Sequence, residues 1–140
     1  MSSIASLYFI DRRLVRRLNR RPLRELLGDR DEMRVAARVL DLLDAYAREV
    51  EPEYDWSGYC MQSVLTHLEE QGARFGTLRR RCGLTYLVET LPRHIDLTGY
   101  EDLFGQDPEE ALMAAEDTVA LLRTATAARR AGELLLIMVG

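Results

Sequence analysis

The residues best suited to chemistry gather in one stretch, residues 55–67, which reads DWSGYCMQSVLTH. It holds the only Trp of the chain, one of its two Cys and one of its two His. At helical spacing Cys60 and His67 share an azimuth, but they lie about 10 Å apart along the axis. That separation is too long for a nucleophile and its base. The stretch therefore offers no cysteine–histidine pair.

A second row in the same stretch has the composition of a hydrolytic triad. Ser63, His67 and Glu70 follow one side of a helix that Gly72 would close. Triads are normally assembled from separate elements whose fold sets their geometry, so we interpret this row as a helix face. We predict an amphipathic helix with His67 as a structural histidine at the edge of its apolar arc. The residues predicted to be buried are Cys60, Met61, Val64, Leu65 and Leu68.

The familiar catalytic and cofactor-binding motifs are absent from the sequence. It contains no glycine-rich phosphate loop, no GxSxG, no HExxH and no dinucleotide fingerprint. Cys60 and Cys82 form no CxxC pair, and His67 and His94 add no metal-ligand spacing. The sequence thus predicts no catalytic residue, no metal and no cofactor. A small enzyme of unknown class, using surface Cys, His or Arg chemistry, is kept as an alternative.

Charge is distributed in blocks of alternating sign around a net value of −4. Residues 1–28 carry seven Arg against two acids, whereas residues 29–72 carry four Arg against eleven. We expect these blocks to neutralise one another across the surface, with Arg12, Arg13, Arg16 and Arg17 facing acids of the same chain. An acidic balance favours a basic protein as partner. Nucleic acid is not expected, and binding it through the Arg-rich residues 12–24 is a further alternative.

The N-terminal half alternates one strand with several helices. The apolar run SIASLYFI predicts a buried strand over 3–10, and Asp11 is a suitable N-cap for a basic helix. Pro22 and Gly28 bound a second short basic helix. A longer helix is predicted from Asp29 to about Glu49. Its wide apolar arc indicates a position at the centre of the domain.

The C-terminal half adds two strands and one long helix. Residues 73–83 predict a basic loop or short helix, and LTYLVETL predicts a strand over 84–91 that stops at Pro92. Asp107-Pro108-Glu109-Glu110 is a typical helix start. The run LLLIMVG, residues 134–140, predicts a strand buried on both faces. We expect one α+β domain over 1–140, in which a small sheet of N-terminal, C-terminal and one middle strand is packed by four to five helices.

The order of these segments resembles a known family. SIASLYFI followed by a helix, the aromatic-led DWSGYCMQSVLTHLEEQG, and a long helix leading into ELLLIMVG are similar to the YfbM-like proteins, short bacterial chains of undefined function. The resemblance implies an α+β fold whose terminal strands lie in one sheet, and it implies no catalytic residues. All 19 basic residues are Arg, which indicates a GC-rich bacterial genome.

Two acidic loops are the candidate partner-binding surfaces. In residues 49–55 carboxylates lie next to aromatic residues in the sequence. Residues 96–110 also contain carboxylates on either side of aromatic residues. Carboxylates steer a basic partner, and aromatic rings anchor it. The alternative places the aromatics in the core and the acids toward water or the Arg clusters. The candidate contact residues are Tyr54, Asp55, Trp56, Tyr100, Glu101, Asp102 and Phe104.

The leading hypothesis is a non-enzymatic, acidic protein-binding domain. An immunity-type or other neutralising partner of a basic protein is the form of this function that we favour. No apolar run reaches the roughly 18–20 residues of a membrane span, and charge follows the first apolar stretch, which is the wrong order for a secretory signal. We therefore expect a cytoplasmic protein without a membrane partner. Homo-oligomerisation is left open.

Overall fold

A computed structural model describes residues 3–20, 32–51, 53–78, 84–100 and 107–140. It contains a sheet of five strands in the order β2-β1-β5-β4-β3, with every neighbouring pair antiparallel. The predicted α+β fold is confirmed. The strands are β1 (Ala5–Asp11), β2 (Ala47–Glu49), β3 (Arg74–Gly76), β4 (Leu84–Thr90) and β5 (Glu133–Val139).

The centre of the sheet consists of the strands that the sequence predicts. β1 and β5 pair along their whole length, from Ala5 opposite Val139 to Asp11 opposite Glu133. β4, the predicted middle strand, pairs with the other edge of β5. β5 is therefore flanked on both edges, and Leu135, Leu136 and Ile137 at its middle are fully buried.

The two edge strands, each three residues long, were not predicted. β2 occupies the last three residues of the predicted helix 29–49, because α3 (Glu32–Tyr46) ends at Tyr46. Ala, Arg and Glu all favour helices, so pairing with β1 overrides local propensity here. β3 lies in the segment predicted as a basic loop or short helix. Residues 79–83, from the same prediction, lie outside the described residues.

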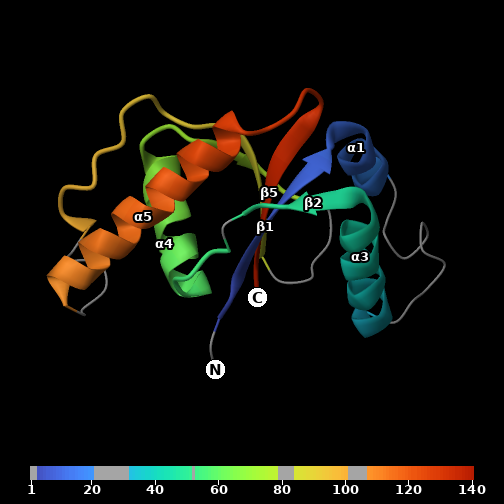
Figure 1. The fold of residues 1–140 in the computed structure, drawn as a ribbon, viewed down its shortest axis with the longest axis horizontal. Coiled ribbons are helices and arrows are strands. Elements are labelled where there is room, and N and C mark those ends of the chain that lie inside the picture. The colour runs from blue at the N-terminus through green and yellow to red at the C-terminus, as the bar shows by residue number, and fades with distance from the viewer. Residues whose placement is uncertain (1–2, 21–31, 52, 79–83, 101–106) are drawn as a thin grey trace.

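Helices cover both faces of the sheet (Figure 1). α4 (Gly58–Glu70) and α5 (Pro108–Ala127) pack on one face, over Leu7, Phe9 and Ile137. α1 (Arg12–Arg20) and α3 lie on the other, where Val15, Leu18 and Leu43 meet the opposite face of the strands. α3 packs on β1 and β2 at the edge of the sheet, so the predicted central position of this helix was wrong. The short helix predicted from Pro22 lies outside the described residues.

Two helix starts follow the capping chemistry predicted from the sequence, and the structure adds a third. The Asp11 carboxylate accepts from the Arg13 N–H at 2.7 Å, and Asp107 accepts from the Glu109 N–H at 3.1 Å. Ser57 caps α4 by accepting from the Cys60 N–H at 3.1 Å. The predicted apolar arc of α4 is buried throughout. No helix in the described ranges is long and apolar enough to cross a membrane.

Candidate functional site: an acidic groove beside the first strand

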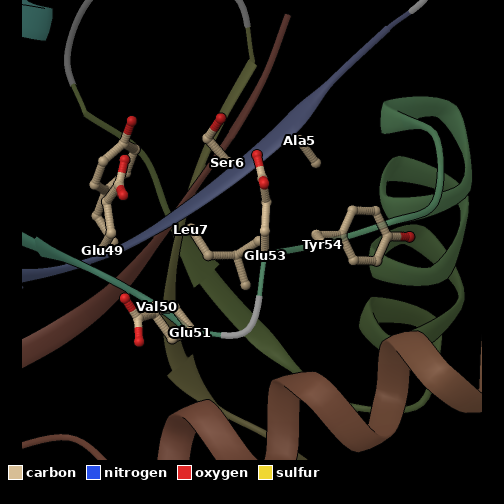
Figure 2. Close-up of a pocket in the computed structure, with 9 residues that line it drawn as sticks. Ala5, Ser6, Leu7, Glu49, Val50, Glu51, Glu53 and Tyr54 are labelled. Carbon is tan, nitrogen blue, oxygen red and sulfur yellow. The ribbon is translucent and has the colours of Figure 1, made fainter.

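Residues 49–51, 53 and 54 lie beside the first half of β1, and a groove of about 370 Å³ lies between them and the strand (Figure 2). β1 supplies the wall at one side, and the acidic loop predicted from the sequence supplies the other. The lining residues are Ala5, Ser6, Leu7, Tyr8, Glu49, Val50, Glu51, Glu53 and Tyr54.

The β1 wall is a strand edge that is only partly paired. Ile4 exchanges two backbone hydrogen bonds with Gly140, of 2.9 and 3.0 Å, on the β5 side. Because hydrogen-bonding groups alternate between the two edges of a strand, those of Ala5 and Leu7 point toward the groove. There the Leu7 carbonyl accepts from the Val50 N–H at 3.1 Å, and in the described part of the chain no other backbone hydrogen bond reaches this stretch from that side.

The opposite wall carries the carboxylates of Glu49, Glu51 and Glu53, all exposed. Their spacing of two residues suits an extended chain, whose alternate side chains share one side. Val50, between the first two, is buried. Glu53 points toward β1 near Ser6 (Figure 2). No basic side chain is among the residues that line the groove, so its field is negative.

The acidic charges also act on Tyr8, which is one of the residues that line the groove. Burial raises the pKa of the Tyr8 phenol, and the nearby charges of Glu49 and Asp44 raise it further. Both effects disfavour a second negative charge beside existing ones. Tyr8 therefore stays a neutral hydrogen-bonding group under the carboxylates.

Tyr54 and Trp56, two predicted contact residues, hold the acidic loop against α5. The Tyr54 hydroxyl lies 2.9 Å from Thr118 Oγ1, and Trp56 Nε1 donates to the Asp117 carboxylate at 3.1 Å. Tyr54 points away from β1 toward the helices (Figure 2). Both rings are half-buried, whereas Asp55 between them is exposed. Their main structural effect is to fix the loop that presents the acids.

Thr118, which the sequence reading missed, is fully buried and central to this anchorage. Besides meeting Tyr54, its hydroxyl donates to the Ala114 carbonyl at 2.6 Å and lies 3.9 Å from the Cys60 sulfur. Burial raises the pKa of Tyr54 well above its ordinary value. Cys60 is thus a buried core residue. The sequence signal for Thr118 was its spacing, four residues after Ala114 and four before Leu122, which places it on the inner face of α5.

The second predicted acidic loop, residues 96–110, is described only in part, and its described residues do not line the acidic groove. Tyr100 is fully buried and packs edge-on against His67, with ring centroids 5.7 Å apart. In this fold its side chain therefore cannot reach a partner. Glu101, Asp102 and Phe104 lie outside the described residues.

His67 fastens the segment that precedes Tyr100. Its Nε2 lies 2.6 Å from the Asp96 carbonyl, and Gln71 bonds both the N–H and the carbonyl of Asp96, at 2.7 and 2.6 Å. Because the acceptor is a carbonyl, Nε2 carries the proton and donates it. This contact is the role expected of a structural histidine.

The row of Ser63, His67 and Glu70 borders a surface hollow of about 490 Å³ between α4 and Thr98-Gly99. Burial raises the pKa of the Tyr100 phenol to about 12. His67 Nε2 is directed at the Asp96 carbonyl. In the described part of the chain no hydrogen bond joins Ser63 to His67, and no group of three potential metal ligands forms.

Comparison with known proteins identified no relative of this chain. No protein-family model, curated protein or solved structure matches the sequence. The YfbM-like resemblance stays a prediction.

Proposed function

We propose that this domain binds a basic, extended segment of another protein in the groove between β1 and residues 49–51, 53 and 54. The observation that carries the proposal is the edge of β1 at Ala5, which no described backbone group pairs on the groove side, next to three carboxylates. The function is that of a non-enzymatic binding domain, with an immunity-type role against a basic protein as the form we favour. The proposal includes a bacterial source, a cytoplasmic location and a YfbM-like relationship, on the sequence features given above.

The strand edge supplies the binding mode. A peptide in β conformation can add to an exposed edge, where main-chain hydrogen bonds give affinity and alternate side chains give specificity. Such a peptide would meet the backbone groups of Ala5 and the Leu7 N–H, since the Leu7 carbonyl already accepts from Val50. β2 is only three residues long, so it covers only part of the β1 edge.

The carboxylates of the groove favour a partner with basic side chains. A peptide alternating basic and apolar residues would turn its cations to one side, toward Glu49, Glu51 and Glu53. Exposed carboxylates speed the association of such a partner, and this acceleration decreases as the salt concentration rises. An acidic segment would meet repulsion at the same place.

Two labelled peptides of about eight residues test the binding mode, because they carry equal charge but differ in pairing capacity. One alternates arginine with valine and the other arginine with proline, which lacks the N–H that a ladder needs. We expect the valine peptide to bind at least about fivefold more tightly in fluorescence anisotropy. Equal affinities would contradict strand addition.

A charge-matched pair of variants tests the location. Glu51→Gln with Glu53→Gln should weaken binding of the valine peptide about threefold to tenfold at low salt, mainly through slower association. Glu69→Gln with Glu116→Gln removes two exposed carboxylates from α4 and α5 and should leave binding unchanged. If both pairs behave alike, the groove is not the site.

A further inference from the structure

We propose that the exposed face of α1 binds the phosphate backbone of a nucleic-acid duplex, without reading its sequence. The surface consists of five arginines, Arg12, Arg13, Arg16, Arg17 and Arg20, all exposed. The site is separate from the acidic groove and does not depend on the function proposed for it.

The arginines form one continuous stripe. At 100° per residue they fall within about 140° of the helix circumference, and Leu14, Val15 and Leu18 occupy the opposite side. Val15 and Leu18 are buried against the sheet, which fixes the basic side toward solvent. Positions 12, 16 and 20 follow one another at about 6 Å along the axis.

Among the described residues, these arginines form none of the ion pairs that the charge blocks led us to expect. In the described residues none of the five takes part in an ion pair, and the salt bridge found there joins Arg48 to Glu133. Asp11 lies beside the stripe, and its carboxylate caps the helix by accepting from the Arg13 N–H. The five arginines outnumber this one carboxylate, so the described surface of α1 is net positive.

The chemistry of the stripe favours phosphates over other anions. Guanidinium groups bind phosphate in a bidentate fashion, and nucleic acid presents phosphates at regular intervals. A protein interface would need aromatic or apolar anchors, which the stripe lacks. A membrane-surface helix would need a free apolar face, but that of α1 is buried in the core. Without aromatic side chains for base stacking, a duplex fits better than a single strand.

The acidic groove offsets this field only in part. Glu49 of the groove lies opposite Tyr8, which is three residues, or about 10 Å, along β1 from Asp11 at the start of α1. That distance is comparable with the screening length of about 8 Å at physiological salt. A net charge of −4 is therefore compatible with a locally basic surface.

Titration of a short, labelled, mixed-sequence DNA duplex at several salt concentrations tests the proposal. Each phosphate contact contributes about 0.9 to the slope of log affinity against log salt. Arg16→Gln with Arg17→Gln should lower the slope by about 2 and weaken binding about tenfold or more at low salt. Both side chains are exposed, so the melting temperature should not change.

Arg74→Gln with Arg93→Gln is the matched control, because it removes two exposed arginines from elsewhere on the surface. This variant should keep the slope of the parent. Glu51→Gln with Glu53→Gln should not weaken duplex binding, which separates this proposal from the groove. Absence of binding at low salt, an unchanged slope in Arg16→Gln with Arg17→Gln, or binding to phosphatidylserine vesicles but not to the duplex would each overturn the proposal.

Discussion

Arg48 connects three strands through one side chain. It belongs to β2, its guanidinium lies 4.2 Å from the centre of the Phe9 ring in β1, and its Nη2 donates to the Glu133 carboxylate of β5 at 2.7 Å. Glu133 also accepts from the Arg130 N–H at 2.8 Å. Burial raises the pKa of the Glu133 carboxyl, but the hydrogen bonds and charges of Arg48 and Arg130 outweigh it, so the pKa lies below its ordinary value.

A lowered pKa makes the contribution of Glu133 to stability depend on pH. The ionised form is favoured in the folded state, so its contribution is present above the ordinary pKa and disappears as pH falls through the folded value. Glu133→Gln should lower the free energy of unfolding by about 1 kcal/mol at neutral pH and progressively less in acid. Urea titrations between pH 3 and 7 measure the difference. Glu116→Gln, a change at an exposed helix residue, is the control, and a pH-independent difference would contradict the assignment.

At the scale of elements, the start of α4 depends on a close approach at Gly58. Its N–H donates to the Ser3 carbonyl at 2.9 Å. A Cβ atom at this position would lie 3.0 Å from Val139 Cγ1 and 3.1 Å from the Ile4 carbonyl carbon, and would overlap Ser3 Oγ. The glycine therefore lets α4 meet the terminal strands directly.

This contact reverses the usual effect of replacing glycine in a helix. Gly→Ala normally stabilises a helix by about 1 kcal/mol. At Gly58 we expect Ala to destabilise the protein by about 1–3 kcal/mol, because the crowded site must move. Chemical denaturation measures the change, and adding Ser3→Gly should recover part of the loss by removing the worst overlap. A more stable Gly58→Ala protein would show that the approach is looser than described.

At the scale of the whole molecule, β5 joins the two halves of the core. Leu135 and Ile137 face α4 and α5, whereas Leu136 faces the side of α1 and α3. Leu136 is fully buried, opposite Tyr8 of β1 and Leu87 of β4. One strand thus contributes to both hydrophobic clusters.

Leu136→Asp should abolish cooperative folding or cost more than about 4 kcal/mol, because a carboxylate would enter a fully apolar site. Thermal melting followed by circular dichroism measures this effect. Leu84→Asp places the same change at an exposed site of β4, where 47% of the residue is accessible, and should cost little. A Leu136→Asp protein that melts within a degree or two of the parent would refute the role of β5.

The sequence by itself determined the long elements and the acidic loop. Apolar runs predict the three long strands, and capping residues such as Asp11 and Asp107 predict where helices begin. These patterns suffice because they act between residues close in the chain. The clustering of carboxylates and aromatic residues in 49–55 likewise predicted an acidic loop.

Only the tertiary structure decided which surfaces these residues form. β2 exists because residues 47–49 find a partner in β1, and the groove lies beyond the last bond of that pairing, from the Val50 N–H to the Leu7 carbonyl. Tyr100 is an anchor of the core and not of a partner, since His67 and α4 cover it. Among the described residues the arginines of α1 form no ion pair, because the fold pairs Glu133 with Arg48 instead. Each outcome depends on pairing between distant segments, which local propensity does not encode.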